Sequence, residues 1–198
     1  MIIKKNIDKK EIANMPKVIF SGNIIVIDTY EEANRAIMAL SKEHIVGFDT
    51  ETKPSFKRGI INKIALIQFA TEYNAYLIRL NKIGLPDFIT DFLANPAVIK
   101  VGLSIRDDFL SIAKRSEISP EGFVELQDYV EQFGIKEKSL QRIYALLFGE
   151  RISKNQRLSN WENETLTAAQ KNYASIDAWA CQKIFRFLEG LKIRTNPF

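Results

Sequence analysis

The sequence predicts an α/β fold in which a mixed central sheet is covered by helices. Strand patterns come first, strands interleaved with helices follow, and helical patterns alone close the chain. The 198 residues, 46% of them hydrophobic, suit one domain of ordinary size with a full core. No run of about 18 apolar residues is present, so we expect no membrane span.

The first half of the chain contains most of the expected strands: residues 17–20, 23–28, 45–51, 63–70 and 75–80. Ser21 and Gly22 between the first two predict a hairpin. Thr29 and Glu32 have capping-box spacing, which predicts a helix from Thr29 to about residue 42. Residues 1–16 are polar and lysine-rich, so we expect an N-terminal arm with one short helix that ends near Pro16.

The second half changes from strands to helices. Prolines bound a helix over residues 86–94, and apolar residues 97–103 and 123–126 predict two more strands. Ser104 is expected to be the N-cap of a helix over 104–115. Further helices are expected at 139–149 and 167–189, the second opened by a capping box of Thr167 and Gln170. No linker interrupts residues 17–192, which predicts a single domain followed by a tail at 193–198.

Two carboxylates end the apolar strand at 45–51. Asp49 and Glu51 should share one face of this strand while Thr50 points to the other, because side chains alternate along a strand. Two nearby negative charges raise each other's pKa unless a cation lies between them, and a divalent metal is the simplest such cation. An isolated Asp-x-Glu pair is, however, more often the solvated end of a strand.

Composition limits what the chain can bind. With one cysteine, Cys181, and one histidine, His44, it can form neither an internal disulfide nor a Cys/His zinc cage. A metal would need oxygen ligands, which favours Mg²⁺ or Mn²⁺. The net charge of +4 fits a polyanionic partner only weakly. The N-terminus lacks a secretory signal pattern, so we expect an intracellular, cytoplasmic protein.

A second acidic pattern opens the helix expected after Ser104. Asp108 lies on the side of the apolar stripe formed by Ile105 and Ile112, whereas Asp107 is rotated toward solvent. The positive end of the helix dipole favours acids in a first turn, which explains Asp107 well. Asp108 needs a partner on the buried side.

A third pattern lies on the last helix. Tyr173 and Asp177 are four residues apart and therefore share one helix face. Ala174 and Ala178 beside them are small, as expected where a helix packs close to a sheet. A Tyr/Asp pair at this spacing is usually structural.

Taken together, Asp49-x-Glu51, Asp108 and Tyr173-x-x-x-Asp177 resemble the DEDDy branch of the 3′-to-5′ exonuclease superfamily. The resemblance covers about residues 20–190. Within the branch the chain is most similar to Werner-type exonuclease domains and more distantly to RNase D. The text between the acids matches as well, at residues 63–69 (KIALIQF), 100–102 (KVG), 158–161 (LSNW) and 166–178 (LTAAQKNYASIDA).

The resemblance implies a ribonuclease H-like, DnaQ-like fold with five or six strands. It implies that Asp49, Glu51, Asp108 and Asp177 hold two divalent ions, Mg²⁺ or Mn²⁺, for two-metal phosphoryl chemistry. Tyr173 would orient the attacking water, since an ordinary phenol is a poor base. The expected partner is the 3′ end of a nucleic acid, DNA in preference to RNA, and the expected products are nucleoside 5′-monophosphates.

Substrate contacts are expected next to these acids. Phe69 or an apolar side chain near Leu103 could stack on the last base, although Phe69 could equally belong to the core. Trp161 is expected to pack rather than bind. The remaining candidates are Thr50 and the basic residues of two loops, which could contact phosphates or simply face solvent: Lys53, Lys57 and Arg58, and Arg151, Lys154 and Arg157. The main alternative function is a catalytically silent member that binds nucleic acid or a protein partner.

Overall fold

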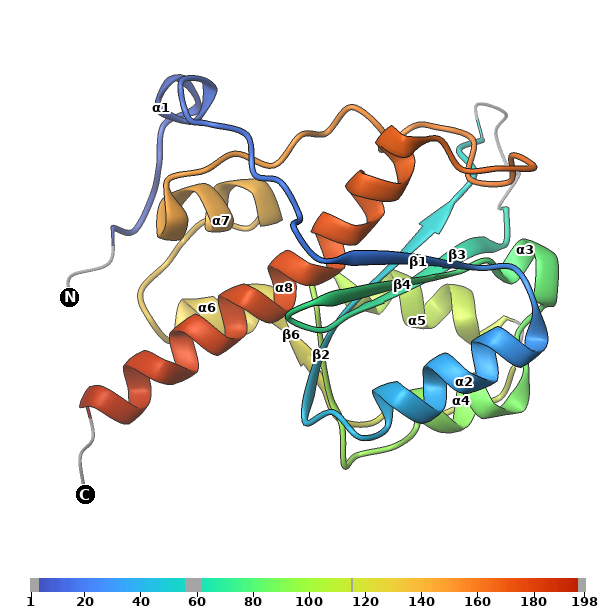
Figure 1. Cartoon of the computed structure of the whole chain (residues 1–198). Helices are drawn as coiled ribbons and strands as arrows, with labels where there is room; N and C mark the ends of the chain where they lie inside the picture. Colours follow the sequence, from blue (N-terminus) through green and yellow to red (C-terminus); the bar gives the residue numbers. More distant parts are fainter. Residues whose placement is uncertain (1–3, 56–61, 115, 196–198) are drawn as a thin grey trace.

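A computed structural model of the chain describes residues 4–55, 62–114 and 116–195. Its centre is a six-stranded mixed sheet with helices on both faces (Figure 1), which confirms the predicted fold class. The strands are β1 (Asn23–Ile27), β2 (Ile45–Thr52), β3 (Ile64–Ala70), β4 (Asn74–Ile78), β5 (Ile99–Gly102) and β6 (Phe123–Glu125). The helices are α1 (Lys9–Ala13), α2 (Tyr30–Leu40), α3 (Leu80–Ile83), α4 (Asp87–Leu93), α5 (Ile105–Ala113), α6 (Leu126–Glu131), α7 (Leu140–Phe148) and α8 (Ala168–Thr195).

The acid-bearing strand β2 lies inside the sheet, whose strand order is β1-β4-β3-β2-β5-β6. It pairs antiparallel with β3 and parallel with β5. The first helix capping box is present as predicted, because the amide of Glu32 donates to the Thr29 hydroxyl. A strand paired on both sides is a rigid support for functional side chains.

The long helix α8 crosses one face of the sheet, and α2, α4 and α5 cover the other (Figure 1). The predicted capping box opens α8, since the amide of Gln170 donates to the Thr167 hydroxyl. The helix lies very close to β2: a Cβ on Gly47 would be 1.8 Å from the carbonyl oxygen of Ala178. The predicted close packing of small residues is therefore confirmed.

The predicted hairpin at 17–20 and 23–28 is wrong. The amide of Val18 donates to the carbonyl oxygen of Arg151 over 3.1 Å, and β1 pairs in parallel with β4. Gly22 permits this path, since a Cβ there would be only 2.3 Å from the Tyr73 carbonyl oxygen. A pairing partner more than a hundred residues away leaves no local signal.

The short helices α3 and α6 were not predicted from the sequence. They contain four and six residues, too few to show a helical period. Among the described residues, no helix combines the length and apolar character that crossing a membrane requires.

Candidate active site

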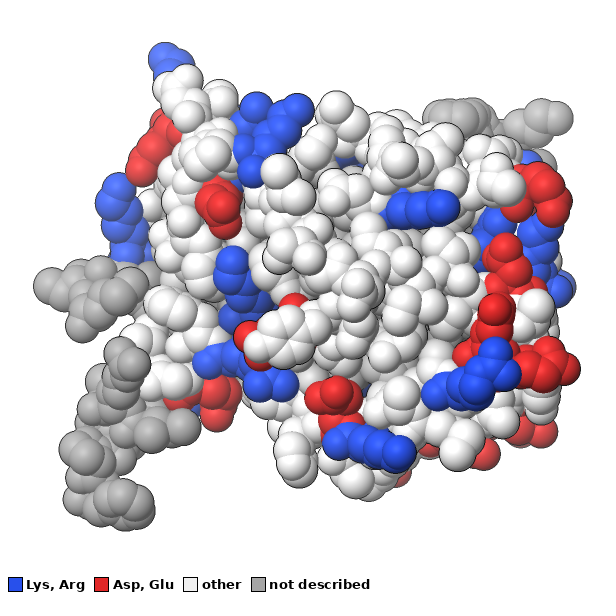
Figure 2. Space-filling view, in the orientation of Figure 1, with Lys and Arg blue, Asp and Glu red and all other residues white. Residues whose placement is uncertain are grey.

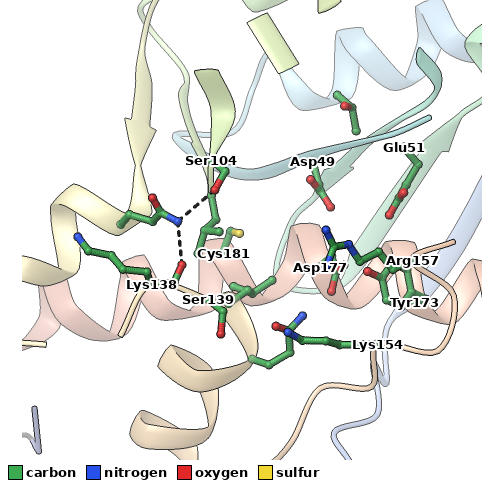
Figure 3. Close-up of a pocket in the computed structure, with 15 residues that line it drawn as sticks. Asp49, Glu51, Ser104, Lys138, Ser139, Lys154, Arg157, Tyr173, Asp177 and Cys181 are labelled. Carbon is green, nitrogen blue, oxygen red and sulfur yellow. Dashed lines mark hydrogen bonds between the residues drawn. The ribbon is translucent and has the colours of Figure 1, made fainter. Parts of the chain in front are cut away.

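Three carboxylates meet where β2 faces α8 (Figure 3). Asp49 and Glu51 project from one face of β2, as the strand period predicted, and Asp177 comes from the helix that covers this face. One oxygen from each lies within 4.8 Å of the others. This is an all-oxygen donor set drawn from two segments that are far apart in the sequence.

Burial and mutual repulsion make this cluster costly to ionise. Desolvation raises the pKa of Asp49 well above its usual value, with Asp177 and then Glu51 adding to the effect. Burial raises the pKa of Glu51 to about 9 and that of Asp177 to about 7. Nearby cations oppose these shifts only in part: Arg157 lowers the pKa of Glu51, and Lys154 lowers that of Asp177.

The donor chemistry fits a hard divalent cation. In the described chain, Oδ1 of Asp177 is buried and has no hydrogen-bond partner. A buried oxygen of this kind normally has a partner, and its lack of one requires an explanation. Carboxylate oxygens are the ligands that Mg²⁺ and Mn²⁺ prefer, so these residues suit such an ion.

Asp108 lies beside the cluster but is held differently. The Thr50 hydroxyl, on the opposite face of β2, donates a hydrogen bond to its carboxylate. Burial raises the pKa of Asp108 to about 7, and the hydrogen bond from Thr50 opposes this rise. Asp108 is half-buried and Asp107 exposed, as the helical period predicted. The partner that the sequence required for Asp108 is therefore a strand hydroxyl.

Tyr173 lies one helical turn before Asp177, and each of the two groups shifts the pKa of the other. Burial raises the pKa of its phenol far above the usual 10, and the acids add to this effect. The phenol is therefore neutral and acts as a hydrogen-bond donor. Its ring lies 6.0 Å from that of Trp161, measured between centroids, and Trp161 is fully buried. The packing role predicted for Trp161 is confirmed.

A cavity of about 410 Å³ opens over the carboxylates. Four of the predicted substrate contacts line it: Thr50, Leu103, Lys154 and Arg157. In Figure 3, Arg157 and Lys154 reach toward the acids from the loop that precedes α8. The cavity therefore combines an acidic floor with a basic rim, an arrangement suited to a metal-bound polyanion.

Other predicted contacts lie elsewhere. Phe69 is fully buried, and its ring packs 5.1 Å from that of Phe92 in the core on the α2 and α4 face. The stacking role for Phe69 is therefore wrong, because strand alternation turns it away from the site. Lys53 pairs with Glu162 at 3.2 Å. Lys57 and Arg58 lie outside the described residues.

Sequence reasoning missed the polar wall of the cavity. Ser104 has a left-handed backbone (φ 63°), and its side chain does not cap α5. The Glu125 carboxylate takes that role and accepts from the amides of Ser104 and Ile105 at 2.9 Å. The Gln127 amide nitrogen donates to Ser104 Oγ at 3.1 Å and to the carbonyl oxygen of Lys138 at 2.8 Å (Figure 3). These contacts span 11 to 23 residues and leave no local pattern.

Gln68 is a second residue that the sequence did not mark. It pairs with Asp49 across β2 and β3 and is fully buried. Neither polar atom of its side chain has a hydrogen-bond partner among the described residues. The only available signal was a polar residue inside an otherwise apolar strand.

Comparison with known proteins agrees with this geometry. A family model described as 3′-5′ exonuclease matches residues 24–191. The mouse bifunctional 3′-5′ exonuclease/ATP-dependent helicase WRN is 32% identical over 190 residues, which cover 90% of this chain and 13% of WRN. A 3′-5′ exonuclease of Arabidopsis thaliana is 27% identical over 90% of this chain and 67% of its own length. The chain thus spans only a small part of the mouse relative.

Two solved structures have the same fold. The Nibbler EXO domain of Aedes aegypti superposes with a TM-score of 0.79 at 21% identity and covers 90% of this chain and 94% of its own. Escherichia coli RNase D, described as an exoribonuclease, gives a TM-score of 0.76 at 20% identity over 85% of this chain and 44% of its own. By the extent of the family match and the identity to relatives, the chain belongs to the 3′-5′ exonuclease family of enzymes.

Proposed function

We propose that this protein removes nucleoside 5′-monophosphates one at a time from the 3′ end of a nucleic acid, with DNA preferred to RNA. The observation that carries the proposal is the buried carboxylate cluster of Asp49, Glu51 and Asp177 at the base of an open cavity. Such a cluster is costly in the folded state, and the described cations Arg157 and Lys154 offset its charge only in part.

The acids supply the ligands for the ions that this chemistry needs. Asp49, Glu51 and Asp177 would hold a divalent ion, and Asp108 beside them provides a fourth carboxylate for a second. We expect two ions, Mg²⁺ or Mn²⁺. When bound, such ions lower the pKa of water and offset the negative charge that develops on the phosphate.

The remaining residues bind and orient. Tyr173 is a neutral donor that would hold a water molecule in line with the terminal phosphodiester. Lys154 and Arg157, both exposed at the rim, would contact phosphate oxygens. Leu103, partly buried in the same cavity, offers an apolar surface to the last base. Thr50 keeps Asp108 oriented.

The test is digestion of 5′-labelled DNA and RNA oligonucleotides of matched sequence. We expect ladders that shorten from the 3′ end in Mg²⁺ or Mn²⁺, with DNA cut faster, and no ladder in EDTA. Asp49→Ala and Asp177→Ala should abolish cleavage without abolishing binding of the labelled strand. Intact wild-type protein that binds both strands and cuts neither would favour the catalytically silent alternative. Faster cutting of RNA would retain the reaction and overturn the preference.

A further inference from the structure

A second cavity continues the active site toward the N-terminal arm. It measures about 270 Å³ and shares Ser139, Gln141 and Lys154 with the cavity over the carboxylates. The two cavities are therefore neighbours along these three residues, and we refer to them together as the groove. Its far end lies between α1 and the start of α7, which are neighbours in Figure 1.

The two ends of this groove carry opposite charge. The active-site end has the carboxylates, whereas the far end is lined by Lys9, Arg142, Arg151 and the shared Lys154, with no acidic side chain among its described lining residues. Arg142 pairs with Glu137 at 2.9 Å, but the other three form no ion pair in the part of the chain that the structure describes. Basic side chains are visible around α1 in Figure 2. Unpaired cations along a groove attract a polyanion.

The arm that carries Lys9 is fixed at its N-terminal side. Ile7 is buried, and its amide donates to the Glu137 carboxylate at 3.0 Å. The amide of Lys136 donates to the carbonyl oxygen of Lys5 at 2.9 Å. These bonds join the arm to the segment between α6 and α7.

The C-terminal side of the arm is fixed to Arg151. Nε of Arg151 donates to the carbonyl oxygen of Met15 at 2.9 Å, and the backbone amide of Arg151 donates to the carbonyl oxygen of Pro16 at the same distance. The helix α1 is thus attached on both sides, and Lys9 is placed by the fold. Arg151 both anchors the arm and lines the groove.

We propose that the N-terminal arm forms part of the substrate groove and that Lys9 and Arg151 contact phosphates on the 5′ side of the nucleotide being removed. The occupant is a single nucleic acid strand, whose 3′ end lies over the carboxylates and whose backbone passes Lys154. Ile12 and Ile152 supply apolar surface beside the cations, as grooves for single strands commonly do. This inference rests on the proposed function.

The groove makes affinity depend on strand length. A dinucleotide can occupy the cavity over the carboxylates, whereas a 12-mer also reaches the basic end. Lys9→Ala should therefore reduce the advantage of the 12-mer over the dinucleotide in kcat/KM. Loss of one phosphate contact is expected to weaken binding of the 12-mer about three- to tenfold and to reduce the slope of log K against log salt by about 0.7.

The matched control is Lys10→Ala, which removes the same charge from the same helix at an exposed position that does not line the groove. We would measure binding of labelled 12-mer in EDTA across a salt series, and cleavage of both lengths in Mg²⁺. Lys10→Ala should behave as wild type, and Lys9→Arg should restore the length dependence. The proposal would be overturned by equal effects of Lys9→Ala and Lys10→Ala, or by a kcat/KM ratio between the 12-mer and the dinucleotide that Lys9→Ala leaves unchanged. If wild-type protein cuts neither length, the proposed function fails instead.

Discussion

Neutralising Glu51 should stabilise the metal-free protein while it removes a metal ligand. Burial, and then the charges of Asp177 and Asp108, raise its pKa from 4.5 to about 9. Between these values the folded state retains a proton that the unfolded state releases. The contribution of Glu51 to the free energy of unfolding is therefore fully present below pH 4.5 and is lost as the pH rises toward 9. Glutamine has no such proton, so Glu51→Gln should remove this loss.

The shift gives the size of the effect. One pH unit over which the folded state holds an extra proton costs about 1.4 kcal/mol. At pH 7.5, about three units above the ordinary pKa of Glu51, the cost reaches roughly 4 kcal/mol. At pH 5 it is below about 1 kcal/mol. We therefore expect Glu51→Gln to raise the free energy of unfolding in EDTA by about 2–4 kcal/mol at pH 7.5 and by little at pH 5.

Urea unfolding followed by tryptophan fluorescence provides the assay, since Trp161 is fully buried in the native state. Glu117→Gln, at an exposed glutamate, is the matched control. Added Mg²⁺ or Mn²⁺ should reverse the order, because an ion that binds only the folded wild type stabilises it by mass action. The reasoning is refuted if Glu51→Gln is no more stable than wild type in EDTA at pH 7.5, or if its gain is the same at both pH values.

Two further substitutions test how the site is held. Gly47→Ala puts a methyl group 1.8 Å from the Ala178 carbonyl oxygen, so it should displace α8 and Asp177. We expect it to lower the free energy of unfolding by about 1–3 kcal/mol and to abolish cleavage. Thermal unfolding and the ladder assay would measure these two effects, and wild-type behaviour in either assay would contradict the close packing. Thr50→Val removes the hydrogen-bond donor to Asp108 and should lower the free energy of unfolding by about 1–3 kcal/mol in EDTA at pH 8. Thr50→Ser keeps the hydroxyl and should not lower it. Equal urea midpoints for the two variants would count against this hydrogen bond.

Local periodicity was enough to predict part of the site. The two-residue period of a strand placed Asp49 and Glu51 on one face and Thr50 on the other, and the four-residue spacing on α8 placed Tyr173 beside Asp177. These rules depend only on neighbours along the chain. Local spacing therefore predicted the position of each acid within its own segment. That the segments bring the acids together in the fold was predicted only by the resemblance to a family.

Features that depend on distant partners were not predictable in this way. Residues 17–20 have a strand pattern, but they pair with Arg151. No local sequence signal predicts this pairing. Phe69 ends an apolar strand near the acids, and only the register with β2 shows that it faces the opposite core. The groove beside α1 likewise exists because the arm is attached to two segments more than a hundred residues away.

The division of the site between rigid and loop elements follows from its electrostatics. The acids need fixed support, because moving apart would relieve their repulsion. They come from an interior strand, from α8, and from α5, whose Asp108 is held by the hydrogen bond from Thr50. The cations Lys154 and Arg157 come instead from an irregular loop and are exposed, so each only partly offsets the raised pKa values. A dication held by the acids would remove this repulsion and free both cations to bind phosphate. Metal binding, fold stability and substrate binding should therefore be coupled at this one cluster.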